Sequence, residues 1–356
     1  MKNKINQPPK HPIGSLIMNY IIGPKIGQGA FGEIYSAIDQ KTGLIWAIKT
    51  EANSSKRKTL TFEYQILARV QSSPTFPRLG ILGHGKDFGF ISMELLGPSL
   101  ATILKELPNH NFSFSTGIRA SYYILKCIES LHVFGFVHRD IKPGNILTRE
   151  GSDHPLCLID FGLSRMYIDQ STGRHLSERP RIGFRGTRAY ASINAHHSHD
   201  LSRRDDLISW FYLTYEFVIG VLPWRSAENK DEIVLIKEKF DVASRVSPIA
   251  PELYEVWRHI SALSFTDTPN YAHIYECLSR ICRRNGLKLN DPFDWAEILH
   301  RHNSKIAKSV EALKPNSGLK QNKVSESELQ EQLLQSTITI PPPFSQFSED
   351  SKCSCC

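Results

Sequence analysis

The chain has 356 residues, of which 40 % are hydrophobic and 22 % are charged, and its formal net charge is +7. These values are typical of a globular protein and exclude a wholly disordered, collagen-like or coiled-coil chain. At roughly 150 residues per domain, the length predicts two units, which can be two lobes of one fold. The densest basic clusters are only pairs of arginines, so we expect no nucleic-acid partner.

Neither a membrane span nor an export signal is predicted. The most apolar stretch, residues 211–224, contains Glu216 and falls short of the about 20 apolar residues that a span needs. Residues 1–18 lack the apolar centre of a signal peptide and are predicted to be a flexible segment. Four of the seven cysteines are scattered, as in intracellular proteins with reduced thiols. We therefore expect a cytoplasmic protein and leave the nucleus open as a second location. Separately, we expect the protein to be a monomer.

Residues 19–95 predict a small β-rich lobe. Its segments are rich in Ile, Tyr and Trp and are separated by glycine-containing turns, which is typical of strands. The strands are predicted over 20–26, 33–38 and 44–50. A helix is predicted over 56–70, because apolar residues recur there at helical spacing.

Residues 96–300 predict a larger, helical lobe. Helical periodicity is strongest over 116–133 and is also present over 205–220 and 251–284. Beyond residue 300 aromatic residues are almost absent, so residues 301–356 are predicted to be a Ser/Pro-containing tail without its own core. Inside this tail, Ser325 and Glu328 match a capping box and predict one short helix.

The first candidate site is a glycine-rich turn between two predicted strands. Residues 27–34 (GQGAFGEI) have the pattern G-x-G-x-x-G-x-I, whose glycines let the backbone approach phosphate oxygens closely. A Rossmann-type site would need a helix after the turn, and here a strand follows. On its own, the motif also fits an ordinary glycine-rich hairpin.

The next strand ends in the sequence AIK, and its lysine is Lys49. A lysine at this place can reach the α- and β-phosphates of a nucleotide. Glu63, in the following predicted helix, can hold Lys49 through an ion pair. Taken alone, Glu63 fits a solvated helix face equally well.

Residues 138–145 (HRDIKPGN) carry the most specific pattern. Asp140 can accept a proton from a substrate hydroxyl or orient it, Lys142 can neutralise a transferring phosphoryl group, and Asn145 can bind a metal ion. Asp160 opens the sequence DFG after an apolar strand and is predicted to be the second metal ligand. Oxygen ligands of this kind suit Mg²⁺ or Mn²⁺.

These motifs, in this order, resemble those of eukaryotic protein kinases. Further segments resemble the casein kinase 1 group, namely 93–100 (MELLGPSL), 191–194 (ASIN) and 203–207 (RRDDL). Within that group the chain is most similar to the tau-tubulin kinase branch, in segments 183–187 (GFRGT), 222–225 (LPWR) and 236–239 (IKEK). The resemblance covers about residues 19–299.

The resemblance implies an α+β protein kinase fold, with a β-rich amino lobe over 19–95, a helical carboxyl lobe over 96–300 and ATP between them. It implies that Met93 is the gatekeeper and that Asp206 braces the catalytic loop. The implied catalytic residues are Lys49, Glu63, Asp140, Lys142 and Thr187, and the implied metal ligands are Asn145 and Asp160. The implied ATP-binding residues are Ile26, Gly27, Gln28, Gly29, Ala30, Phe31, Gly32, Ile34, Ala47, Lys49, Met93, Glu94, Leu96 and Ile159.

The activity implied is that of a non-specific serine/threonine protein kinase, which uses ATP with Mg²⁺ or Mn²⁺. Casein kinase 1 relatives act on protein substrates with acidic or phosphorylated surroundings, and hold the anion with a basic site. Two positions depart from that site, because Ala189 and Glu228 stand where an arginine and a lysine are typical. Two alternatives stay open, a catalytically silent binding protein on a kinase fold and a membrane-tethered scaffold.

Two clusters of possible metal or lipid chemistry lie outside these motifs. His196, His197 and His199 form an H-H-x-H cluster, which we interpret as a solvated loop because no further ligand pattern accompanies it. The chain ends in CSCC, and Cys353, Cys355 and Cys356 are either reduced thiols or lipid attachment sites. Two lipid chains would hold the protein at a membrane.

Overall fold

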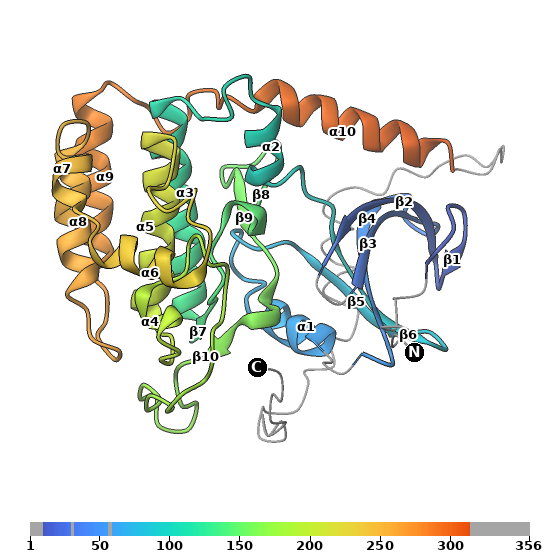
Figure 1. The fold of residues 1–356 in the computed structure, drawn as a ribbon. Helices are drawn as coiled ribbons and strands as arrows, with labels where there is room; N and C mark the ends of the chain where they lie inside the picture. Colours follow the sequence, from blue (N-terminus) through green and yellow to red (C-terminus); the bar gives the residue numbers. More distant parts are fainter. Residues whose placement is uncertain (1–9, 30–31, 56–58, 314–356) are drawn as a thin grey trace. The chain divides into compact units, whose positions relative to one another are not determined.

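The computed structural model describes residues 10–29, 32–55 and 59–313. These residues belong to one compact unit that ends at Leu313. The short helix predicted near Ser325 and Glu328, and the terminal cysteines, lie outside the described residues. Within the described part, a curved sheet lies beside a larger group of helices, which confirms the predicted α+β, two-lobed fold (Figure 1).

The small lobe is a six-stranded antiparallel sheet with one helix. Its strand order is β1-β2-β3-β4-β6-β5. The strands are β1 (Leu16–Ile17), β2 (Tyr20–Gln28), β3 (Gly32–Asp39), β4 (Ile45–Ala52), β5 (Leu79–His84) and β6 (Phe88–Glu94), and the helix is α1 (Thr59–Arg69). The predicted strands agree with β2, β3 and β4 to within a few residues at each end.

One face of this sheet is buried in the core of the small lobe, and the other face carries Lys49. One face forms a closed core of Ile17, Tyr20, Ile22, Tyr35, Ala37, Ile48 and Phe90. Lys49 follows Ile48 and therefore lies on the opposite face, because successive side chains of a strand alternate. The carboxylate of Glu51 accepts hydrogen bonds from the Thr59 and Leu60 amides at the start of α1. A carboxylate at a helix N-terminus is stabilised by the helix dipole, so this contact fixes α1 against the sheet.

The large lobe is built around two long helices, α3 (Phe114–Val133) and α5 (Arg203–Ile219). The indole of the buried Trp210 donates to the Ser121 carbonyl and ties α5 to α3. The remaining α-helices are α2 (Leu100–Glu106), α4 (Ile193–His196), α6 (Lys230–Glu238), α7 (Val242–Val246), α8 (Pro251–Ser261), α9 (Tyr271–Arg284) and α10 (Ala296–Glu311). None of the helices in the described ranges is long and apolar enough to cross a bilayer.

Two short antiparallel ribbons and two 3-10 turns flank the HRD and DFG sequences. β7 (Phe136–Val137) pairs with β10 (Arg165–Met166), and β8 (Ile146–Thr148) pairs with β9 (Leu156–Leu158). The 3-10 turns are Pro143–Asn145 and Phe161–Leu163. These ribbons place the HRD and DFG sequences next to each other at one edge of the large lobe.

The helical periodicity over 251–284 is interrupted in the structure. Helix α8 ends at Ser261, and α9 begins at Tyr271. The side chain of Asn270 accepts a hydrogen bond from the His273 amide and thereby caps α9. Pro269 just before this cap cannot continue a helix, so the residues that break the pattern were already visible in the sequence.

Helix α10 crosses the predicted boundary between lobe and tail at residue 300. It leaves the large lobe and runs over the sheet of the small lobe (Figure 1). Val310 is buried against Ile21 and Ile38, and Ile306 and Leu313 pack around them. The few apolar residues between 301 and 313 pack against an apolar patch on β2 and β3. This packing explains why the helix extends beyond the predicted boundary at residue 300.

Shortening Val310 to alanine should lower the free energy of unfolding by about 2 kcal/mol, because it removes two buried carbons and leaves a small cavity. Urea unfolding of the purified chain measures this difference. Lys308→Ala is the matched control, since Lys308 is exposed on the same helix. Equal midpoints for the two variants would contradict the packing of α10 on the sheet.

Candidate active site

The catalytic loop brings together the three predicted residues Asp140, Lys142 and Thr187. Lys142 Nζ lies 2.6 Å from Asp140 Oδ2, and the Thr187 hydroxyl donates to Asp140 Oδ1 at 2.7 Å. Lys142 Nζ is also 3.2 Å from the Thr187 hydroxyl. The amide of Asn145 donates to the Asp140 carbonyl at 3.0 Å, which leaves its side-chain oxygen for a cation. Asp140 is thus held in one position by three neighbours.

The buried carboxylate of Asp206 holds the backbone of the catalytic loop, as the resemblance implied. Its carboxylate accepts the His138 and Arg139 amides, each at 2.7 Å, and His132 Nε2 at 2.9 Å. Burial alone would raise the pKa of Asp206, but these donors outweigh it and hold the pKa below its usual range. The contacts stabilise a strained loop, since Arg139 has a φ of 68°.

Gly186 allows Thr187 to approach Asp140. Its φ is 95°, a conformation that favours glycine. A Cβ at this position would lie 2.7 Å from the Arg139 carbonyl oxygen. Glycine is therefore required at position 186, because two backbone segments approach each other closely there.

Lys49 links the sheet to helix α1 and to the DFG turn. Its ammonium group forms an ion pair with Glu63 and lies 3.5 Å from Asp160 Oδ1. Burial works to lower the pKa of Lys49, but the Glu63 and Asp160 carboxylates outweigh it and raise the pKa. Lys49 is therefore a fixed positive charge that faces the space between the lobes.

Asp160 has the left-handed backbone conformation, with a φ of 66°, directly before the turn Phe161–Leu163. Phe161 is fully buried and packs edge-on against Phe76 and His138. Although burial opposes ionisation of Asp160, Lys49 lowers the pKa of its carboxyl group. Its side chain stays 44 % exposed, so an ionised oxygen remains free for a cation beside Asn145.

The glycine turn joins β2 and β3 above Lys49. The Gly29 amide donates to the Gly32 carbonyl, and a Cβ on Gly32 would lie 1.6 Å from the Thr50 carbonyl oxygen. Gly27 and Gln28 end β2, and Gly27 pairs with Ile34. Ala30 and Phe31 lie outside the described residues.

Strand register brings the predicted adenine-site residues to one face of the sheet. Ile34 lies opposite Lys49, and Ala47 lies opposite Met93. Since Ala47 and Lys49 are two residues apart, all four side chains share one face. Ile26 is exposed near the end of β2, and Ile159 directly precedes Asp160. Among the described residues, neither backbone polar group of Leu96 has a hydrogen-bond partner.

The carboxylate of Glu94 has a structural partner that the sequence did not reveal. Arg149 Nε and Nη2 donate to its two oxygens at 3.0 and 2.7 Å. The same guanidinium donates to the Phe76 carbonyl. Glu94 begins the segment 94–97, the hinge that joins the two lobes, and the contact with Arg149 ties this segment to the large lobe. No local pattern around Arg149 predicts such a distant partner.

A cavity of about 550 Å³ lies beside the catalytic loop, between α2 and α5. Lys142, Tyr190, Glu216 and Arg225 are among its lining residues. Arg225 Nη1 is 3.5 Å from Glu216 Oε1, so the charge of this arginine is balanced. Lys142 connects this cavity to the catalytic loop, because it lines the cavity and its ammonium group contacts Asp140.

The arginines of the segment after DFG differ in their partners. Asp200 forms ion pairs with Arg165 and Arg179. In the described part of the chain, Arg181, Arg185 and Arg188 take part in no ion pair, and Arg181 and Arg188 are exposed. Arg188 directly follows Thr187, so a basic charge remains near the catalytic loop although position 189 is alanine.

The interpretation of the histidine cluster as a solvated loop is wrong for His196. This residue is buried, and its Nε2 lies 3.3 Å from Lys237 Nζ. Lys237 is buried too and donates to the Arg188 and Ala191 carbonyls, with Trp224 beneath its ammonium group. Lys237, on α6, therefore positions the segment that carries Thr187.

His196 should make the protein less stable as the pH falls from 6.5 towards 4. Burial, and next the charge of Lys237, lower the pKa of His196 to about 4. The unfolded chain, with a histidine pKa of about 6.5, therefore binds an extra proton in this range, which favours unfolding. At pH 5 the cost is about 2 kcal/mol.

Urea unfolding at pH 7 and pH 5 tests this expectation. His196→Gln should reduce the loss of stability between the two values, because glutamine does not titrate. The exposed neighbour His197 provides the control His197→Gln. An identical pH dependence in wild type and His196→Gln would contradict the expected protonation.

Comparison with known proteins gives two results. Residues 20–288 match the protein kinase domain family. Over 285 residues the chain is 36 % identical to a Dictyostelium discoideum protein named "probable serine/threonine-protein kinase". The aligned region covers 79 % of this chain and 57 % of that protein, so the chain spans little more than half the length of this relative.

Proposed function

Because the chain belongs to the protein kinase family, we propose that it is an active serine/threonine kinase of the casein kinase 1 type. The observation that carries the proposal is the joint placement of Lys49, Glu63 and Asp160 with Asp140, Lys142 and Thr187. A catalytically silent binding protein would not require all six of these side chains in a catalytic arrangement. The proposed assignment to the casein kinase 1 group, and to its tau-tubulin kinase branch, rests on the sequence segments given above.

The chain's own residues can perform the parts that phosphoryl transfer requires. Asp140 orients a substrate hydroxyl and accepts its proton, while Lys142 offers positive charge to the developing phosphoryl charge. Lys49, fixed by Glu63, holds the phosphates of the nucleotide. Asn145 and Asp160 offer oxygen atoms that suit Mg²⁺ or Mn²⁺. When bound, the metal ion would neutralise phosphate charge, and ATP would supply the phosphoryl group.

For the substrate, we propose serine or threonine in acidic or phosphorylated surroundings. The support is the excess of unpaired positive charge around Arg181, Arg185 and Arg188. Glu228 weakens this site relative to the casein kinase 1 pattern, and Arg225 is neutralised by Glu216. Arg188 is therefore the residue on which the proposed preference depends most.

Transfer from labelled ATP·Mg²⁺ to casein and to three matched peptides tests both parts of the proposal. The peptides carry phosphoserine, aspartate or alanine three residues before the acceptor serine. We expect transfer that Asp160→Asn abolishes, with the phosphorylated peptide preferred over the alanine peptide by about fivefold, or about 1 kcal/mol. Loss of transfer with retained ATP binding would favour the silent binding protein.

Arg188→Ala should reduce the preference for the phosphorylated peptide without changing the KM for ATP, because Arg188 lies outside the nucleotide site. Arg174→Ala is the matched control, since it removes an exposed arginine from the same segment. An unchanged peptide ratio in Arg188→Ala would refute the proposed anion contact but leave the kinase activity itself untouched. Membrane attachment through Cys353, Cys355 and Cys356 stays a prediction.

A further inference from the structure

Helices α8 and α9 carry matching pairs of potential metal ligands that belong to none of the kinase motifs. Glu255 and His259 are four residues apart on α8, and His273 and Cys277 are four apart on α9. Residues at this spacing share one face of a helix. The two helices lie side by side in the large lobe, so these faces meet (Figure 1).

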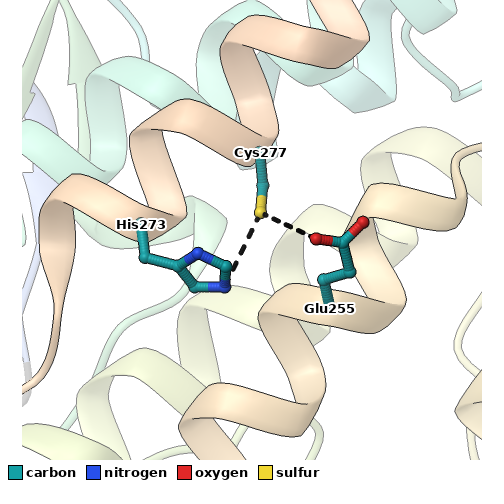
Figure 2. Close-up of side chains that lie close together, drawn as sticks. All are labelled: Glu255, His273 and Cys277. Atoms are coloured by element: carbon teal, nitrogen blue, oxygen red, sulfur yellow. Dashed lines mark hydrogen bonds between the residues drawn. The ribbon is translucent and has the colours of Figure 1, made fainter.

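Three of the four side chains point towards one another (Figure 2). Cys277 Sγ lies 3.8 Å from His273 Nε2 and 4.0 Å from Glu255 Oε2. In a tetrahedral zinc site, bond lengths of about 2.0–2.3 Å put neighbouring ligand atoms about 3.5 Å apart. All three ligand atoms lie within 4.8 Å of one another, so side-chain shifts of about 1 Å or less would bring them to the spacing of a zinc coordination sphere.

We propose that Glu255, His273 and Cys277 bind a Zn²⁺ ion between α8 and α9, with water as the fourth ligand. A thiolate and an imidazole select zinc over the hard cations Mg²⁺ and Ca²⁺. His259 lies close, with its ring centroid 5.6 Å from that of His273, but its Nε2 already accepts the Asn270 amide. The site is open on the side of Glu255, whose side chain is 44 % exposed.

Arg280 occupies the place of the cation in the structure. Its Nη2 lies 2.6 Å from Glu255 Oε2 and 3.2 Å from Cys277 Sγ. The guanidinium thus uses two of the three atoms that would bind the metal, which shows that this place favours positive charge. The arginine side chain is 37 % exposed, so it can turn into solvent when the ion enters.

Zinc binding at this site exchanges one cation for another and releases a proton. Burial raises the pKa of the Cys277 thiol, so the sulfur is protonated without metal. The metal binds the thiolate, and the thiol proton passes to solvent. Arg280 competes with the ion, so its removal should strengthen zinc binding, whereas a purely structural ion pair predicts no such gain.

Cobalt(II) is the spectroscopic probe for the test. The full chain is used with Cys353, Cys355 and Cys356 replaced by serine, so that the terminal cysteines bind no metal. We expect one equivalent of Co²⁺ to produce a thiolate-to-cobalt charge-transfer band and tetrahedral d–d bands, and Zn²⁺ to displace them. Absence of a saturable one-to-one complex would overturn the proposal.

Variants assign the ligands. Cys277→Ser should abolish the charge-transfer band, and His273→Asn should weaken Co²⁺ binding about 10–100-fold. Cys282→Ser is the control, because it removes a second buried thiol of α9. Arg280→Gln should tighten binding about tenfold. A band that persists in Cys277→Ser, or an unchanged affinity in Arg280→Gln, would overturn the proposal. Melting temperatures equal to that of the parent protein show that the variants are folded.

Discussion

Replacing Asp140 with asparagine should lower kcat by about 10²–10⁴-fold, the range of a lost general acid–base group. The substitution keeps the size of the side chain and one oxygen for Lys142 or Thr187. It removes the negative charge that both of these groups contact, and with it the base that accepts the hydroxyl proton. The KM for ATP should change little, because Lys49 and Asp160 stay in place.

Steady-state transfer to casein measures the effect. Asp153→Asn provides the same chemical change at an exposed position of the large lobe and should leave kcat unaltered. A kcat for Asp140→Asn within threefold of wild type would mean that Asp140 does not act on the substrate hydroxyl.

Replacing Asp206 with alanine should lower the free energy of unfolding by about 3–5 kcal/mol, the cost of leaving buried donors without their charged partner. The His138 and Arg139 amides and the His132 imidazole would all lose their acceptor. Asp206→Asn keeps one acceptor oxygen and should cost about 2 kcal/mol.

Urea unfolding separates these two variants from wild type, again with Asp153→Asn as the reference. Activity should fall together with stability, because the same carboxylate fixes the backbone on either side of Asp140. If Asp206→Ala unfolded at the wild-type midpoint, the loop would have to be held by other contacts.

The sequence predicted the part of the site that depends on local chemistry. The glycine turn, the AIK strand and the HRD and DFG segments each combine a short motif with its own strand or turn. Once β3, β4 and β6 pair, their register brings Ile34, Ala47 and Met93 to the face of Lys49 without further information. Local patterns were sufficient for these residues because their neighbours are set by adjacent strands.

The contacts that the sequence could not predict connect distant segments. Lys237 and His196 are buried because α6 packs on the segment that carries Thr187, and a lysine or histidine pattern gives no sign of it. Arg149 reaches Glu94 across the hinge in the same way. These polar residues lie inside because each has a long-range partner, and such partners are fixed only by the complete fold.

Helix α10 provides a second connection between the two lobes, in addition to the hinge. The hinge near Glu94 is one link, and α10 with Val310 against Ile21 and Ile38 is the other. Because α10 packs on β2 and β3, we expect any opening of the lobes about the hinge to slide this helix over the two strands or to detach its last turn. We therefore expect this apolar contact, which lies outside the predicted nucleotide site, to slow nucleotide exchange, and substitutions within 301–313 to change the exchange rate.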